Sequence, residues 1–306
     1  MLNNEYYALK EVPKYVLYSK GKIYSHLTEP NILQKFTRYN FLPKIISSFQ
    51  DYDNIYLITT YYNGKSLNVL KRKNMTEEQI KFISACTIQS LIYLRKEKVI
   101  HRDITFNNII MDKNKYFNLI DFSFSINYSQ KDHKEKYFNT FECVSPPEML
   151  NFQKFYYNSD YYRLGSIIYY LIFKKYPCNV KIEKNIKNLK VNYKDAKNYS
   201  RNCIDFINKL IISDPKKRIG FKDINELKYH SWFNGFDWNN FEKKKLDSPF
   251  KLIKSSQRLC NKIPISDKFL MKYKSYSRNK IYKLLIKQFN YANIKILNKS
   301  LFIYRK

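Results

Sequence analysis

The stretch Val99–Ile126, VIHRDITFNNIIMDKNKYFNLIDFSFSI, carries the pattern that decides how this chain is interpreted. It places Asp103, Asn108 and Asp121 among apolar runs that are typical of buried strands. Carboxylate and amide groups beside buried segments are unfavourable unless they hydrogen-bond or face a cation. The pattern therefore predicts that these three side chains gather around a positive charge.

The composition favours a folded protein without a membrane span. Apolar residues make up 44% of 306 residues, which suffices for one large or two small domains with a core. The formal charge is +30, but lysine, asparagine, isoleucine and tyrosine are frequent everywhere rather than in one stripe, so we expect no dedicated nucleic-acid binding. The five cysteines form no CxxC pair, which argues against a disulfide framework or zinc site. Without a signal peptide or a long apolar run, we expect an intracellular, cytoplasmic location. The oligomeric state does not follow from the sequence.

The first part of the chain reads as strands around one helix, and the later part as helices. YYALKEV (6–12) and the two runs on either side of QDYDN (50–54) are strand-like, whereas 23–36 has helical spacing. Asn63–Gly64 breaks the pattern like a linker. A capping box at Thr76 and Gln79 then opens a strongly amphipathic helix, and further helices are predicted within 160–173, 200–212 and 223–233.

The spacing of the opening stretch resembles the protein-kinase catalytic loop, H-R-D-x-x-x-x-N, followed by the D-F-G position. His101, Arg102 and Asp103 supply the first three letters, Asn108 the fourth, and Asp121 the D of D-F-G. The resemblance implies that Asp103 orients or accepts the proton of a protein substrate's hydroxyl group. It further implies that Asn108 and Asp121 hold Mg²⁺ on ATP, which would be the missing cation.

Other residues extend the resemblance to the nucleotide site. Lys10 in YALK matches the lysine that contacts the α- and β-phosphates, and Glu29 stands where the family places its ion-pair partner. Because Glu29 precedes Pro30, we expect it in an early helical turn. The resemblance also implies an adenine site that comprises Ala8, Thr60, Tyr62 and Ile110, with Thr59 as the gatekeeper.

The implied fold is α+β, a two-lobed protein-kinase-like fold with a truncated, antiparallel, β-rich small lobe at 1–62, a large helical lobe at 63–245 and a tail at 246–306. In the large lobe, the resemblance pairs Glu148 with Arg218, and Asp160 is expected to hold the backbone of the catalytic loop. The segment 230–253 is similar to the end of the core in AGC-group kinases. IKQFNY (286–291) is either that group's hydrophobic motif, with Phe289 docking in the small lobe, or an ordinary amphipathic helix.

The sequence also departs from the family pattern. No Gly-rich loop precedes Lys10, so we expect the small sheet to lose strands and expose an edge. Ser123 replaces the glycine of D-F-G, where a Cβ disfavours positive φ. Thr105 replaces a lysine that contacts the transferred phosphate. The segment from Ser123 to Thr140 has Lys136 where a phosphorylatable residue is expected, although Ser129 or Tyr137 could serve as a phosphosite for Arg102.

Two residues bear on substrate preference. Ser66 and Asn107 occupy positions where AGC kinases that prefer basic substrates carry glutamate, so a preference for arginine is not expected. Three functions stay open from the sequence: a protein Ser/Thr kinase that uses ATP and Mg²⁺, a pseudokinase that serves as a scaffold, and a basic protein that binds lipid or nucleic acid. The joint presence of the base and metal residues favours the kinase.

Overall fold

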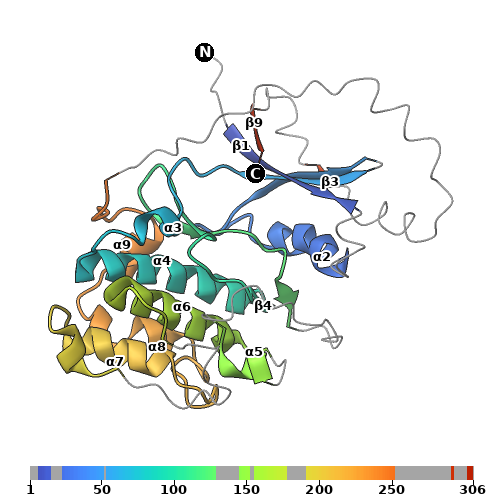
Figure 1. Cartoon of the computed structure of the whole chain (residues 1–306). Helices are drawn as coiled ribbons and strands as arrows, with labels where there is room; N and C mark the ends of the chain where they lie inside the picture. The colour runs from blue at the N-terminus through green and yellow to red at the C-terminus, as the bar shows by residue number, and fades with distance from the viewer. Residues whose placement is uncertain are drawn as a thin grey trace.

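The computed structural model describes residues 6–14, 23–51, 53–128, 145–151, 155–177, 191–251, 291–292 and 302–305, and Figure 1 shows them in two lobes. The small lobe consists of a sheet and helix α2 (Ile23–Gln34). The large lobe is mainly helical and lies below the sheet in Figure 1. The α+β architecture expected from the sequence is therefore present.

The small-lobe sheet has the strand order β8-β2-β3-β1-β9. Its central strands are β1 (Tyr6–Pro13), β2 (Ile45–Gln50) and β3 (Asn54–Thr60), and both neighbouring pairs are antiparallel. The turn between β2 and β3 is closed by Asp51, whose Oδ1 accepts the backbone N–H groups of Asp53 at 2.8 Å and Asn54 at 2.6 Å. The predicted strands on either side of this turn are confirmed.

The prediction that the small sheet exposes an open edge is wrong for the first half of β1. Tyr6–Leu9 pair in parallel with β9 (Phe302–Arg305), and β2 pairs with β8 (Tyr291–Ala292) on the opposite side. Unpaired N–H and C=O groups along a strand are satisfied well by another strand. Segments near the end of the chain thus supply the outer strands, and this pairing over about 300 residues has no local sequence signal.

The expected position of Glu29 is also wrong. Helix α2 runs through Pro30, so Glu29 lies in its interior rather than in an early turn. Proline removes one backbone donor inside a helix and normally disfavours this arrangement. Both residues are buried, and the exposed fraction of Glu29 is only 4%. Tertiary contacts of the glutamate, described below, outweigh the local preference.

The large lobe is built around α4 (Glu77–Lys96), whose predicted capping box between Thr76 and Gln79 is confirmed. The other helices in the described part of this lobe are α3 (Leu67–Leu70), α5 (Pro147–Asn151), α6 (Tyr157–Phe173), α7 (Arg201–Leu210), α8 (Asn225–Lys228), α9 (Trp238–Glu242), and the 3₁₀ turns η2 (Tyr193–Ala196) and η3 (Ser231–Phe233). The predicted helix at 223–233 is therefore two short pieces, because His230 is extended and its ring caps the N–H of Trp232.

Two short strand pairs, one enclosing the other in the chain, form the frame of the stretch 99–127. Strand β4 (Val99–Ile100) pairs with β7 (Ile126–Asn127), and β5 (Ile109–Met111) pairs with β6 (Phe117–Leu119), both antiparallel. The loop from β4 to β5 and the loop from β6 to β7 therefore both run between the same two strand pairs. Asp103 and Asn108 lie on the first loop and Asp121 on the second, so the pairing brings the three residues to one place.

Two expected scaffold contacts of the large lobe are confirmed. Arg218 forms a two-pronged ion pair with Glu148, with N–O distances of 2.8 and 3.0 Å. Asp160 of α6 accepts the backbone N–H groups of His101 at 2.7 Å and Arg102 at 2.9 Å. These buried contacts connect α5 to the turn after α7, and the loop after β4 to α6. In the described ranges, no helix has the length and apolar character that a bilayer crossing requires.

Candidate active site

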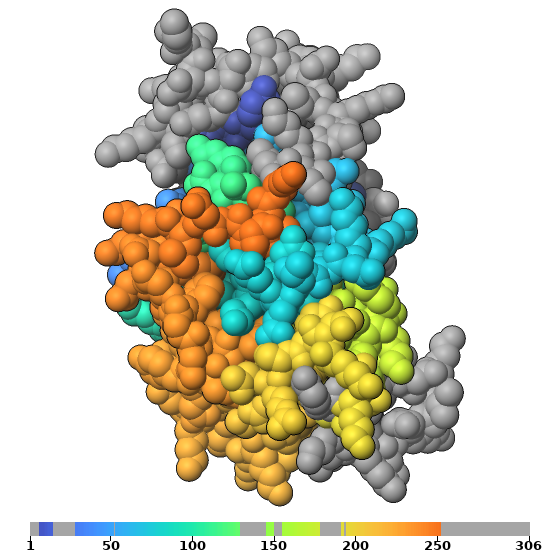
Figure 2. All heavy atoms as spheres, turned by 90° about the vertical axis from the view of Figure 1, so that its left-hand side faces the viewer, coloured from blue at the N-terminus to red at the C-terminus, as the bar shows by residue number. Residues whose placement is uncertain are grey.

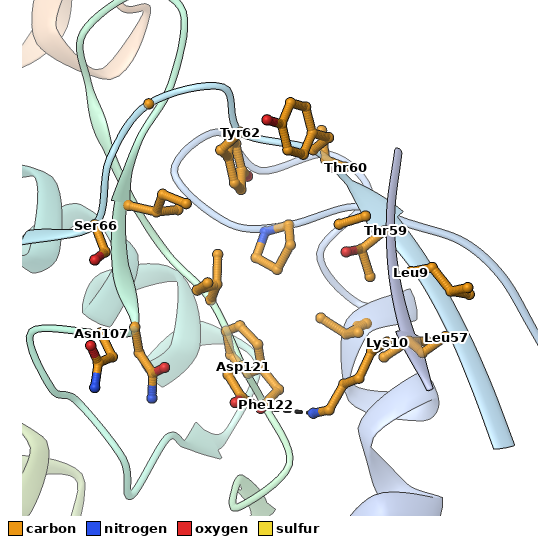
Figure 3. A pocket seen from close by; sticks show the side chains of 18 of the residues that line it. Leu9, Lys10, Leu57, Thr59, Thr60, Tyr62, Ser66, Asn107, Asp121 and Phe122 are labelled. Atoms are coloured by element: carbon orange, nitrogen blue, oxygen red, sulfur yellow. Dashed lines mark hydrogen bonds and ion pairs between the residues drawn. The ribbon is translucent and has the colours of Figure 1, made fainter. Parts of the chain in front are cut away.

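A cavity of about 810 Å³ lies between the small-lobe sheet and the large lobe. Eight of the nine candidate residues line it, namely Ala8, Lys10, Glu29, Thr60, Tyr62, Asn108, Ile110 and Asp121. Figure 3 shows the side chains converging from β1, β3 and the loops of the large lobe. Asp103 does not line the cavity, but its carboxylate is hydrogen-bonded to Asn108, which does. The size is typical of a site for a small organic ligand.

Lys10 of β1 is held by two carboxylates from opposite lobes. Its Nζ lies 2.9 Å from Glu29 Oε2 and 2.8 Å from Asp121 Oδ1, and Figure 3 marks the contact with Asp121. Burial by itself would lower the pKa of Lys10, but Asp121 and Glu29 outweigh burial and raise it. Burial raises the pKa of Glu29, and Lys10 partly opposes this. Lys10 is therefore a fixed ammonium group at the inner end of the cavity.

Asp103 and Asn108 are joined across the turn of their loop. The side-chain amide of Asn108 donates to the backbone carbonyl of Asp103 and to its carboxylate Oδ2, both at 2.9 Å. The amide oxygen of Asn108 does not take part in these bonds, so it stays available as a hard oxygen ligand. This arrangement orients the Asp103 carboxylate and explains why the asparagine stands five residues after it.

Asp121–Ser123 connects the two lobes. The N–H of Phe122 donates to Glu29 Oε1 at 3.1 Å, and the Phe122 ring packs against Phe36 of the small lobe at a centroid distance of 5.0 Å. The hydroxyl of Ser123 donates to Asp121 Oδ1 at 2.7 Å. Left-handed φ, 66°, occurs at Asp121 and not at Ser123, so a Cβ at position 123 is no obstacle to this conformation.

Arg102 also has a left-handed φ of 66°, and its guanidinium is in contact with protein groups. Its Nε donates to the carbonyl of Phe124, and its Cζ lies 4.8 Å from the centre of the Phe155 ring. Such a cation–π contact stabilises a buried guanidinium. The candidate phosphosites Ser129 and Tyr137, with Lys136 and Thr140, lie outside the described residues, as does Phe289.

The cavity lining includes residues that the sequence interpretation did not single out. Leu33, Pro43, Leu57, Val69 and Ile120 add apolar walls. Gly64 is required here, because its N–H donates to Met111 O at 3.0 Å and a Cβ would come within 2.5 Å of the same oxygen. Of these residues, only Leu33 could have been predicted from the sequence, since it follows Glu29 by one helical turn and so lies on the same helix face. The others depend on the packing of separate segments.

Comparison with known proteins fits this geometry. The family model for the protein kinase domain matches residues 1–233. The chain belongs to the protein kinase domain family. A probable serine/threonine-protein kinase of Dictyostelium discoideum is 27% identical over 251 residues, which cover 80% of this chain and 54% of the relative. The probable serine/threonine protein kinase IRE4 of Arabidopsis thaliana is 30% identical over 270 residues, covering 77% of this chain and 26% of the relative. The chain therefore spans about half the length of the first relative and about a quarter of the length of the second.

Protein kinase domains generally use ATP and Mg²⁺, and the donor set in this kinase domain fits that metal. Mg²⁺ prefers oxygen ligands and is usually held by one or two carboxylates together with phosphates and water. Asp121 offers a carboxylate and Asn108 an amide oxygen, and both line the same cavity. Among the described residues, no group of three or more His, Cys, Asp or Glu residues could hold a metal by itself. The arrangement thus suits a metal that arrives with a nucleotide.

Ser123 should help the kinase domain to bind Mg²⁺ through Asp121. Hydrogen bonds to a ligating carboxylate typically change metal affinity 10- to 100-fold. We expect Ser123→Ala to raise the Mg²⁺ concentration for half-maximal thermal stabilisation by ATP about tenfold. The matched control is Ser125→Ala, which removes a buried hydroxyl in the same turn that donates to His101 O at 3.3 Å. Equal Mg²⁺ requirements in the two variants would contradict the expectation.

His101 should make the kinase domain less stable in acid. Burial, the largest cause, lowers its pKa from 6.5 to about 4. The unfolded chain then takes up the proton near pH 6.5 and the folded chain only near pH 4, so the stability from neutral His101 is complete above pH 6.5 and is lost as the pH falls. We expect a loss of about 2 kcal/mol at pH 5, partly offset by Asp160, whose pKa burial raises to about 6.

The measurement is urea unfolding at pH 7 and pH 5 for the wild type and for His101→Gln. The variant should lose less stability between the two pH values than the wild type does. If the variant lost as much unfolding free energy between pH 7 and pH 5 as the wild type, protonation of His101 would not be the cause of the loss.

Proposed function

We propose that this chain transfers the γ-phosphate of ATP to serine and threonine hydroxyl groups of proteins. The observation that carries the proposal is the joint placement of Lys10, Glu29 and Asp121 in one ion-pair network beside the Asp103–Asn108 pair. An ammonium, two groups suited to Mg²⁺ and a carboxylate base are the set that phosphoryl transfer requires. The names of the two relatives, both probable serine/threonine kinases, support the same class.

Each residue has a distinct role in the proposal. Lys10, kept in place by Glu29, contacts the α- and β-phosphates, and Ala8 and Ile110 enclose the adenine, which bonds to the backbone at Thr60 and Tyr62. Asn108 and Asp121 bind Mg²⁺, which when present neutralises charge on the phosphates. Asp103 accepts the proton of the substrate hydroxyl as that hydroxyl oxygen bonds to the γ-phosphorus, and the bond from this phosphorus to the bridging oxygen breaks, with ADP as the leaving group. Asn108 fixes the orientation of Asp103 by its amide hydrogen bond.

A pseudokinase is the second candidate, and a specific observation favours it. Thr105 stands where the family carries a lysine that contacts the transferred phosphate, so one cationic donor fewer would stabilise that phosphate. Against this stands the ion pair of Lys10 with Glu29, which a mere scaffold does not need. The likeness to AGC-group kinases belongs to the proposal as well, and the segment 230–253 supports it.

The test is transfer of labelled γ-phosphate from ATP to a set of protein and peptide acceptors. The proposal expects label on serine and threonine but not on tyrosine, with a requirement for Mg²⁺. Nucleotide binding without any transfer would favour the pseudokinase.

A further inference from the structure

A group of basic side chains lies where two segments of the large lobe meet beside the cavity. Lys71, Arg72 and Lys73 follow helix α3, and Lys174 and Lys175 follow α6. We refer to these five residues as the basic cluster. Figure 2 shows the light-blue surface around α3 directly above the yellow-green surface of α6. Arg72, Lys73, Lys174 and Lys175 are exposed, and Lys71 is half-buried.

The basic cluster is attached to the loop that carries Asp103. In α3, the N–H of Asn68 donates to the carbonyl of Phe106 at 2.9 Å. The ammonium of Lys71 lies 4.9 Å from the centre of the Phe106 ring and 5.3 Å from that of Tyr170 in α6. Phe106 stands between Asp103 and Asn108 in the chain. A protein segment that presents a hydroxyl to Asp103 therefore passes close to these cations.

Lys174 keeps the two halves of the basic cluster together. Its ammonium donates to the carbonyl of Lys71 at 3.1 Å and to that of Lys73 at 2.7 Å, at the end of α3. Burial lowers the pKa of Lys174. Burial also lowers the pKa of Lys71, and the neighbouring Arg72 lowers it further. Arg72 thus adds repulsion to the half-buried ammonium of Lys71, and an anion bound there would relieve that repulsion.

Within the described residues, the basic cluster has no acidic partner. None of the five side chains forms an ion pair there. The cavity lining next to α3 contains Lys65, Ser66 and Asn107, which bear no negative charge. The carboxylates in that lining are Glu29 and Asp121, and both contact Lys10 instead. On the side of α3, the cavity lining therefore has no carboxylate that would attract a basic substrate, while Lys65 would repel one.

We propose that the basic cluster binds acidic residues that flank the acceptor hydroxyl in protein substrates, so that this kinase domain prefers acidic sequences. The proposal rests on the proposed function. Lysine acts as a compact point charge that pairs with a carboxylate without strict geometry. Complementary charges of this kind mainly set specificity and speed of association. They would select the substrate, while Asp103 and the nucleotide site perform the transfer.

The experiment compares kcat/KM for three serine peptides of equal length. One carries glutamates at the second, third and fourth positions on both sides of the serine, one carries alanines there, and one carries arginines. In the wild type we expect the glutamate peptide to exceed the alanine peptide roughly fivefold and the arginine peptide to fall below it. The advantage should shrink as ionic strength rises from about 0.05 to about 0.5 M, since salt screens exposed charges.

The decisive variant is Arg72→Glu/Lys73→Glu, which we expect to remove or invert the glutamate-to-alanine ratio. The matched control, Lys216→Glu/Lys217→Glu, makes the same charge change at exposed lysines in the turn after α7 and should keep the wild-type ratio. Equal transfer to the alanine and glutamate peptides would overturn the role of the basic cluster and leave the proposed function intact. Transfer to no peptide would remove the proposed function and the inference together.

A second arm uses vesicles with about 30% phosphatidylserine. Binding that the Arg72→Glu/Lys73→Glu variant loses, in an enzyme without preference among the peptides, would overturn the substrate role and assign the basic cluster to an anionic membrane surface instead.

Discussion

The substitution Asp103→Asn is expected to lower kcat about 10²- to 10⁴-fold while leaving nucleotide binding nearly unchanged. Asparagine has the shape of aspartate but cannot accept the proton of the substrate hydroxyl. Asp103 does not line the nucleotide cavity, and it contacts that cavity through Asn108. The loss should therefore appear in the rate of transfer and not in the affinity for ATP.

The measurement is single-turnover transfer of labelled phosphate together with thermal stabilisation by ATP and Mg²⁺. Asp112→Asn is a useful control, because Asp112 lies in the turn of the β5–β6 hairpin between Asn108 and Asp121, where it is paired with Lys244 at 2.5 Å. Asp112→Asn should lower the stability of the chain, but it should change the rate of transfer per folded molecule much less than Asp103→Asn does. A rate for Asp103→Asn within a few-fold of the wild type would exclude Asp103 as the base.

The substitution Glu148→Ala is expected to destabilise the chain by about 3–5 kcal/mol. Glu148 and Arg218 are almost fully buried, with exposed fractions of 4% and 1%. The glutamate also accepts a hydrogen bond from Ser159 at 2.8 Å, and the guanidinium donates to the carbonyl of Asn158 at 2.7 Å. Removing the carboxylate leaves a buried guanidinium without its charge partner, which accounts for most of the expected loss.

Urea unfolding provides the measurement for this pair. The double variant Glu148→Leu/Arg218→Met should be less destabilised than Glu148→Ala, because no unpaired charge remains. Lys209→Ala, which removes a half-exposed ion pair with Asp205 in α7, should have a much smaller effect. A loss below about 1 kcal/mol for Glu148→Ala would show that Arg218 finds other partners on mutation.

Local patterns predict those parts of the fold in which neighbours in sequence are neighbours in space. The capping box at Thr76 and the turn at Asp51 are of this kind. The family resemblance additionally indicates contacts across large sequence separations, such as Lys10 with Glu29 and Asp160 with the backbone at His101. These distant contacts are predictable because each partner belongs to a motif with a recognisable spacing.

Other features have no local signal. The interior position of Pro30 in α2 depends on the contacts that Glu29 makes with Lys10 and Phe122. The pairing of β1 with β9 joins the two ends of the chain. A Cβ at Ser123 opposes positive φ, yet the positive φ of this turn falls on Asp121 instead. In each case, the deciding energy comes from tertiary contacts rather than from local propensity.

The central claim is that the cavity binds ATP with Mg²⁺ through Lys10, Asn108 and Asp121. A thermal-shift titration with ATP, with and without Mg²⁺, tests it most directly on the wild type and on Asp121→Ala. At ATP concentrations about 100-fold above Kd, we predict a rise in Tm of about 5 °C that requires Mg²⁺ and is absent in the variant. No shift in the wild type at millimolar ATP and Mg²⁺, or an equal shift in Asp121→Ala, would contradict the account.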